Sequence, residues 1–155
     1  MQFLIRPADE LDVVAMAEIR ARRWGTRDFW MDRIGLYLKG EYFPQQALPP
    51  RAVFVADDDG TVVGFAAGHQ TQRFGCDGEL EWIDVAEERR RYGIAGDLLS
   101  RVGEWFVENS LRSICVNVDP DNAPARRLYA KHGAVVLNAH WMIWEDAESM
   151  SQPVI

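Results

Sequence analysis

VAEERRRYGIAGDLL, the stretch from Val85 to Leu99, decides the fold of this chain. The pattern predicts a strand that ends near Val85 and an amphipathic helix that continues to about Asn109. Because the first N–H groups of a helix lack partners and carry a partial positive charge, the basic turn between the two can bind a pyrophosphate. Small residues at Gly93, Ala95 and Gly96 would let such a ligand approach the main chain.

An ordinary helix start with a solvated arginine run is the alternative interpretation of this turn, and the turn alone does not decide between them. The segment is not a Walker loop, because no Gly-Lys-Ser/Thr follows, and it is not a GxGxxG turn. These two exclusions argue against mononucleotide and dinucleotide binding.

Periodicity on both sides of the turn predicts a mixed succession of strands and helices. The sequence Asp57-Asp58-Asp59-Gly60 favours a hairpin turn over a calcium loop, since it lacks the alternating ligands and the distant Glu of that motif. The expected strands cover about residues 3–6, 53–56, 61–68, 80–85, 114–118, 134–138 and 140–145. Helices are expected to begin near residues 9, 26, 94 and 122, and about residues 41–50 to form a loop.

A second motif follows the expected strand at 114–118. It has the spacing Asn-x-x-Ala-x-x-x-Tyr-x-x-x-Gly and consists of Asn122, Ala125, Tyr129 and Gly133. The first motif reads Arg-x-x-Gly-x-Ala at Arg90, Gly93 and Ala95, about 30 residues earlier. With both motifs in this order, the chain resembles the GNAT superfamily of acyl-CoA-dependent N-acetyltransferases.

The resemblance implies an α/β (α+β) fold of the GNAT type. A twisted, mostly antiparallel sheet would be flanked by about four helices and would splay between the strands at 80–85 and 114–118, with the cofactor in the splay. One departure is Ala134, where the family usually has Phe after the glycine. That difference concerns packing more than chemistry.

The resemblance also implies a binding site for acetyl-CoA. Main-chain groups of Ile83, Asp84 and Val85 would pair with the pantetheine arm like an added strand. The turn would hold the pyrophosphate through Arg90, Arg91, Tyr92, Gly93, Ile94, Ala95 and Gly96. Asn122, which would contact the pantetheine, and Ala125 complete the cofactor site.

Transfer to an amine needs a base and an acid, because an alkylammonium with a pKa near 10.4 must lose a proton and a leaving thiolate gains one. Tyr129, which the resemblance places near the sulfur, is protonated at neutral pH and could be the acid; a core tyrosine is the alternative. Glu79 and Glu81 lie two apart on one strand and so share a face, where either could be the base, directly or through water. Two exposed edge carboxylates are the alternative here. Asp84 is expected to face the other way.

Length and composition set the remaining expectations. The 155 residues, 48% of them hydrophobic, predict a single domain over residues 1–147 and a loosely ordered tail over 148–155. A net charge of −7 argues against nucleic acid as a partner and weakly favours a cationic amine. No signal peptide and no apolar run of about 18 residues is found, so a cytoplasmic protein without membrane contact is expected.

Neither the cysteines nor the histidines add a site. Cys76 and Cys115 form no CxxC pair and lie outside both motifs. His69, His132 and His140 share no metal-ligand spacing, so no metal is expected.

We therefore expect an N-acetyltransferase that moves an acetyl group from acetyl-CoA to a primary amine of a small molecule or peptide. The amine would attack directly in a ternary complex, without a covalent enzyme intermediate. A CoA-binding sensor or interaction module without turnover and a purely structural domain are the alternatives. The sequence does not identify the acceptor, and assembly as a homodimer is left open.

Overall fold

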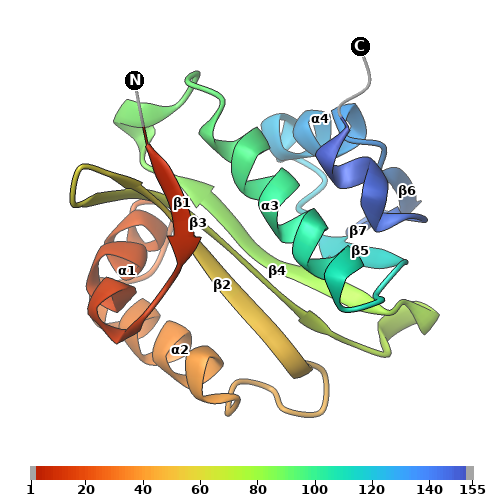
Figure 1. Ribbon diagram of the computed structural model, residues 1–155, viewed down its shortest axis with the longest axis horizontal. Coiled ribbons are helices and arrows are strands. Elements are labelled where there is room, and N and C mark those ends of the chain that lie inside the picture. The colour runs from red at the N-terminus through yellow and green to blue at the C-terminus, as the bar shows by residue number, and fades with distance from the viewer. Residues whose placement is uncertain (1–2, 153–155) are drawn as a thin grey trace.

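A computed structural model describes residues 3–152 and contains a seven-stranded sheet (Figure 1). Its strand order is β1-β2-β3-β4-β5-β7-β6. The strands are β1 Leu4–Pro7, β2 Leu48–Asp58, β3 Thr61–Gln70, β4 Gly78–Val85, β5 Ile114–Asn117, β6 Val135–Asn138 and β7 Trp141–Trp144. Neighbouring strands are antiparallel except β4 and β5, which run parallel. The expected mostly antiparallel sheet is confirmed.

Helices cover both faces of the sheet (Figure 1). On one face lie α1, Val13–Ala21, and α2, Arg27–Lys39. On the other lie α3, Ile94–Glu108, and α4, Ala123–Lys131. The expected number of about four flanking helices is therefore confirmed among the described residues.

Capping side chains explain where two of these helices begin. The Phe29 N–H group donates to the Thr26 hydroxyl at 3.1 Å at the start of α2, and Gly40, with a left-handed φ of 77°, ends that helix. The Ala125 N–H group donates to the Asn122 side-chain oxygen at 3.2 Å at the start of α4. Such acceptors satisfy N–H groups that a helix start leaves unpaired.

The sheet opens between β4 and β5. Their pairing ends at Leu80 and Val116, although β4 continues to Val85. Residues 81–85 therefore keep β3 as their strand neighbour on one edge and have no paired strand on the other. The expected splay is confirmed at this place.

A β-bulge lies in β4 at Glu81. Leu80 pairs with Gly68 and Trp82 pairs with Ala67, so residue 81 is an extra residue in the ladder with β3. A bulge interrupts the alternation of side chains along a strand. Glu81 and Trp82 consequently both project toward the face covered by α1 and α2.

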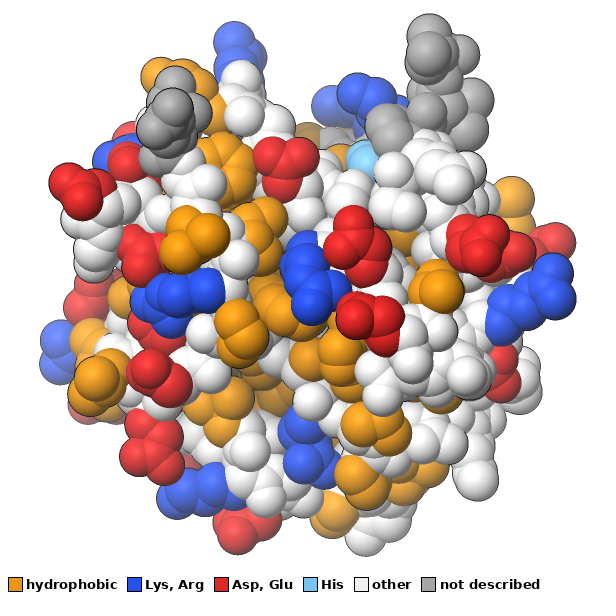
Figure 2. All heavy atoms as spheres, in the orientation of Figure 1, with side chains coloured by type: hydrophobic (Ala, Val, Ile, Leu, Met, Phe, Trp, Pro, Cys, Tyr) orange, Lys and Arg blue, Asp and Glu red, His pale blue; other side chains and the backbone are white. Residues whose placement is uncertain are grey.

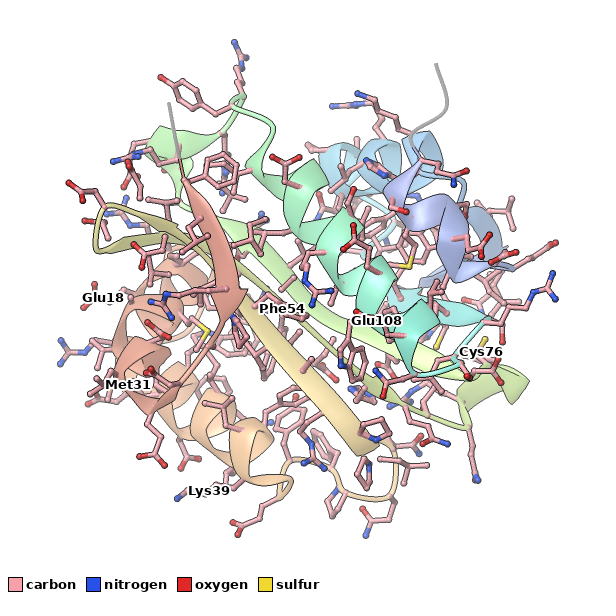
Figure 3. The ribbon with its side chains drawn as sticks, in the orientation of Figure 1. Glu18, Met31, Lys39, Phe54, Cys76 and Glu108 are labelled. Atoms are coloured by element: carbon pink, nitrogen blue, oxygen red, sulfur yellow. The ribbon has the colours of Figure 1, made fainter. Side chains whose placement is uncertain are left out.

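Two apolar cores lie on opposite faces of the sheet. The core under α3 contains Leu98, Val102 and Phe106, which confirms the expected apolar stripe. Phe54 of β2 belongs to the same core (Figure 3), and the Arg101 guanidinium lies 4.5 Å from its ring centroid. The core under α1 and α2 includes Met16, Trp30, Ile34, Tyr37, Phe65 and Trp82.

The segment after β7 is more ordered than expected. Residues Ala147–Ser151 form a 3-10 turn in which the Met150 side chain is fully buried beside Gly103 of α3. His132 Nδ1 donates to the Met150 carbonyl at 2.7 Å. The prediction of a loosely ordered tail is thus wrong for residues 148–151, because Met150 fills space that a glycine leaves on the helix; residues 153–155 lie outside the described residues.

The surface drawn in Figure 2 mixes acidic, basic and apolar side chains. On that face the described residues form no continuous basic surface of the kind that a nucleic-acid backbone would need. None of the described helices is long and apolar enough to cross a membrane.

Candidate active site

The turn between β4 and α3 presents a row of main-chain N–H groups. Arg91 and Gly93 have left-handed backbone, with φ of 73° and 79°, and α3 begins without a side-chain cap. The N–H groups of residues 91–96 donate to no acceptor within the described part of the chain, and the first helical bond runs from the Asp97 N–H to the Gly93 carbonyl at 3.1 Å. Unpaired donors at the positive end of a helix form an anion-binding site.

This turn is open enough to admit a diphosphate. A Cβ atom built on Gly93 would meet no atom within 4 Å. Arg90, Arg91 and Tyr92 are exposed around it. The Ile94 side chain is buried in the core, so that residue offers only its main chain. The residues predicted to bind the pyrophosphate therefore fit that group.

The open edge of β4 can accept an extended ligand. The Ala86 N–H group donates to the Val63 carbonyl on β3 at 2.8 Å. Successive N–H groups of a strand point to opposite edges, so those of Val85 and Ile83 point into the splay. There the Val85 N–H group donates to the Asp84 carboxylate at 3.1 Å. A ligand that added here as a strand would compete with that bond.

Asp84 faces α1 and α2, which corrects the expectation that it faces away from the other two carboxylates. The bulge supplies the physical reason, because one extra residue reverses the alternation beyond Glu81. Asp84 is 2% exposed. Its carboxylate accepts a hydrogen bond from Arg23 Nε at 2.9 Å and lies 3.6 Å from Arg20 Nη1. Two guanidinium groups therefore compensate the charge of Asp84, and its carboxylate is occupied by these ion pairs.

Glu79 is also buried and paired. Its carboxylate accepts a hydrogen bond from Arg73 Nε at 3.0 Å, and its Oε1 lies 3.4 Å from His69 Nε2. The other ring nitrogen of His69 lies 2.9 Å from the Tyr37 hydroxyl. Tyr37, His69, Glu79 and Arg73 thus lie next to one another in a buried row under α2, with hydrogen bonds at its two ends and a longer approach between His69 and Glu79.

Glu81 differs from both neighbours because it is half-buried and forms no hydrogen bond or ion pair to a described residue. Burial is the main reason that its pKa rises to about 7; the charge of Glu79 raises it as well, while Arg73 and Arg20 oppose the shift. A carboxyl that ionises near neutral pH suits a general base. Of the two predicted bases, the structure favours Glu81.

The imidazole of His69 has an unsatisfied nitrogen. Its Nε2 is buried and has no hydrogen-bond partner among residues 3–152. A ring nitrogen of His69 and carboxylate oxygens of Glu79 and Glu81 all lie within 4.8 Å of one another. Such a group can attract a cation, either an ammonium or a metal ion. The expectation of no metal stays a prediction.

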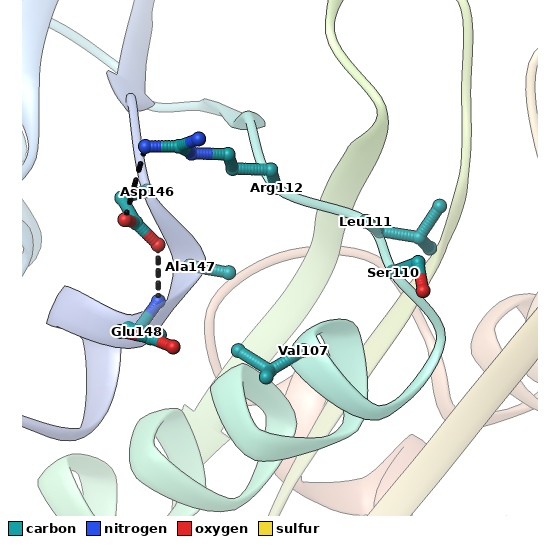
Figure 4. A pocket seen from close by; sticks show the side chains of 7 residues that line it. All are labelled: Val107, Ser110, Leu111, Arg112, Asp146, Ala147 and Glu148. Atoms are coloured by element: carbon teal, nitrogen blue, oxygen red, sulfur yellow. Dashed lines mark hydrogen bonds and ion pairs between the residues drawn. The ribbon is translucent and has the colours of Figure 1, made fainter.

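A cavity of about 200 Å³ opens over these carboxylates. It is lined by Tyr42, Phe43, Gln46, Ala47, Arg73, Glu79, Glu81, Asn117 and Trp141. A larger hollow of about 370 Å³ lies between the end of α3 and the last 3-10 turn, where Arg112 pairs with Asp146 (Figure 4). The larger hollow contains no residue of either motif. The smaller cavity is therefore the candidate acceptor site.

Tyr129 lies in the core against Trp144, with ring centroids 5.4 Å apart. Burial raises the pKa of its hydroxyl above the ordinary value; Arg23 and Arg20 lower it in part, and Asp84 raises it. The hydroxyl is therefore protonated at neutral pH and lies within electrostatic reach of β4. These properties fit an acid, and a tyrosine of the core as well.

Apart from Glu79 and Glu81, the residues of the acceptor cavity and the neighbouring His69 were missed from the sequence. Tyr42 comes from a loop and Arg73 from a short 3-10 turn, and their places depend on the conformation of those segments. His69 lies opposite Glu79 across β3 and β4. The sequence does contain a signal for His69. It lies at the end of an expected strand, and pairing of that strand with the strand that carries Glu79 would place the two side chains together.

A comparison with protein families gives one match. The model for the acetyltransferase (GNAT) family matches residues 12–134. Among curated proteins, an uncharacterised N-acetyltransferase, YuaI, from Bacillus subtilis is 37% identical over 75 residues, which are 46% of this chain and 43% of that protein. The chain spans less than half the length of the two curated relatives that it matches.

Solved structures agree in fold. A GNAT-family protein from Desulfovibrio desulfuricans superposes with a TM-score of 0.75 at 16% identity, over 94% of this chain and 99% of that one. The PaiA N-acetyltransferase from Thermoplasma acidophilum, solved in complex with coenzyme A, superposes with a TM-score of 0.69 at 14% identity, over 92% and 98%. At such identities the likeness establishes the fold alone.

Proposed function

Since the chain belongs to the GNAT family of acetyltransferases, we propose that it transfers an acetyl group from acetyl-CoA to a primary amine. The observation that carries the proposal is Glu81, a carboxyl with a pKa of about 7 on the wall of the 200 Å³ cavity that pairs with none of residues 3–152. Such a group can remove a proton from an ammonium ion near neutral pH. The open turn at residues 91–96 supports the cofactor side of the proposal.

Acetyl-CoA supplies the activated acetyl group when it is bound. The N–H groups of residues 91–96, with Arg90 beside them, would hold its diphosphate. The open edge of β4 at Ile83 and Val85 would hold its pantetheine arm. The Asn122 side-chain oxygen is occupied by the cap of α4, which leaves its NH₂ group to contact the arm.

The reaction forms a bond between the amine nitrogen and the acetyl carbon and breaks the carbon–sulfur bond. Ionised Glu81 accepts the first proton from the ammonium, directly or through one water, and passes it to solvent. Tyr129 donates its hydroxyl proton to the sulfur, and the second proton that leaves the nitrogen restores it. Overall one proton is released for each amide formed.

The cysteines of the chain are poor nucleophiles, which supports direct attack by the amine. Cys76 and Cys115 are 4% and 0% exposed. Burial raises the pKa of both thiols, so both are protonated at neutral pH. A covalent acetyl-cysteine step would need an exposed thiolate.

Thiol release from acetyl-CoA in the presence of an amine panel tests the proposal. We expect release that depends on the amine and on Glu81, with Glu81→Gln retaining acetyl-CoA binding by calorimetry. The panel should contain alkylamines, arylalkylamines, amino acids, aminoglycosides and peptide N-termini. Binding of acetyl-CoA without turnover of any amine would refute the enzyme and favour a sensor.

A further inference from the structure

Aromatic side chains form much of the wall of the acceptor cavity. Tyr42 and Phe43 pack edge to face, with ring centroids 4.7 Å apart. Trp141 of β7 also lines the cavity, and Phe74 packs against it at 4.9 Å. Flat ring faces bind planar apolar groups and also attract cations. The cavity therefore combines aromatic walls with two carboxylates.

Two of these aromatic residues are held in strained backbone. Phe43 and Phe74 have φ of 39° and 57°, in the left-handed region that bulky residues rarely adopt. Both side chains are also exposed, by 57% and 52%. Burial in the core therefore does not account for the strain. Strained residues of this kind concentrate at ligand sites, where their position serves binding.

The described part of the cavity wall offers no free cation to a carboxylate on the acceptor. Among the described residues that line it, Arg73 is the one with a positive charge. Its Nε donates to Glu79 at 3.0 Å, and its guanidinium lies 5.1 Å from the centroid of Trp141. A carboxylate on the substrate would have to compete with Glu79 for Arg73 and would meet the charge of Glu81. Such repulsion discriminates against amino acids.

The cavity is also small. Its volume of about 200 Å³ is below the roughly 300–1,000 Å³ of sites for drug-sized ligands. A compact molecule fits such a space better than an aminoglycoside does. Gln46 and Asn117 are the uncharged polar side chains that line it.

On the basis of the proposed function, we infer that the acceptor is a small primary amine that carries an aromatic ring and no carboxylate. The ammonium lies against Glu81 and Glu79, and the ring lies among Tyr42, Phe43 and Trp141. Phe74 packs edge to face against Trp141.

Matched substrates test this inference. The ratio kcat/KM is measured for phenethylamine, n-hexylamine, phenylalanine, kanamycin and the peptide amide Phe-Gly-Gly-NH₂. We expect phenethylamine to exceed n-hexylamine about tenfold and phenylalanine about a hundredfold or more. A preference for phenylalanine, kanamycin or the peptide would overturn the inference and leave the acetyltransferase standing. Inactivity toward every amine, with acetyl-CoA still bound, would refute both.

Variants locate the ring. Phe43→Leu and Trp141→Leu should each lower kcat/KM for phenethylamine about tenfold and change that for n-hexylamine little, since each removes a ring face. Trp24→Leu is the matched control, because Trp24 is 57% exposed and does not line the cavity. Equal losses for both amines in the two cavity variants would contradict the placement of the ring.

Discussion

The cofactor side and the acceptor side of the proposed site are built from different kinds of group. The cofactor side uses main-chain N–H groups from one stretch, residues 83–96. The acceptor side uses side chains from the loop before β2, the loop before β4, β4 itself and β7. Main-chain groups persist when side chains change, so the cofactor side can keep its ligand while the acceptor side changes its specificity. Substitutions that affect one side and leave the other intact test this division.

The largest effect on turnover is expected for Tyr129→Phe, because the proposal places Tyr129 between the cofactor side and the acceptor side. The substitution keeps the ring against Trp144 and removes the hydroxyl. Turnover should fall by about 10²- to 10⁴-fold, the usual contribution of a positioned general acid. Calorimetry with acetyl-CoA and kcat are measured together. A weakened affinity with normal kcat would assign Tyr129 to the cofactor pocket instead.

A loss of about 100-fold or more in turnover is expected for Glu81→Gln. The base must be ionised, so kcat/KM of the parent protein should rise as the pH passes through the Glu81 pKa of about 7, and the variant should lack that limb. Glu79→Gln is the control. Because the Glu79 charge raises the pKa of Glu81, removing it should move the limb to lower pH without abolishing it. An unmoved limb in both variants would exclude Glu81 as the titrating group.

Gly93→Val should abolish most of the stabilisation by acetyl-CoA, which amounts to about 2.7 kcal/mol at a hundredfold excess over its Kd. The side chain would occupy the open space beside the unpaired N–H groups. Gly60→Val is a matched control, since Gly60 also has positive φ and open space around it but lies in the hairpin turn between β2 and β3. Thermal unfolding with and without acetyl-CoA separates the two. A normal shift in Gly93→Val would place the diphosphate elsewhere.

The smallest effect is expected at Asn122, which has two roles in the proposal. Asn122→Ala should lower the free energy of unfolding by about 1 kcal/mol through loss of the cap of α4. Asn122→Ser keeps a capping oxygen, so stability should be nearly unchanged while affinity for acetyl-CoA still falls. Chemical denaturation and calorimetry on both variants give the two quantities. Full affinity in the serine variant would remove Asn122 from the cofactor site.

The sequence predicted what depends on local pattern. The stripe on α3 and the hairpin at residues 57–60 follow from side-chain periodicity and turn chemistry, and both are present. The resemblance to the family supplied the splay. The predicted direction of the Asp84 side chain was wrong, because a single extra residue in β4 leaves no mark in the alternation of polar and apolar residues.

Other features depend on contacts between distant segments. Arg73 reaches Glu79 only because the loop before β4 folds back over the strand. The burial of Met150 depends on a glycine 47 residues earlier on α3. The start of β2 at Leu48, five residues before the expected strand at 53, follows from its pairing with Gln70. Pattern reasoning over short windows does not contain these pairings.

The bulge in β4 has a consequence for how such a site can diversify. Upstream of residue 81 the strand is in one register with β3, and downstream it is in another. A deletion at that position would rotate Glu79 to the side of α3 while Ile83 and Val85 kept their edge toward the splay. The side-chain directions of the two halves of β4 are therefore set relative to each other by residue 81. The half before residue 81, which faces the acceptor, can change by mutation. The half after it, which faces the cofactor, can stay the same.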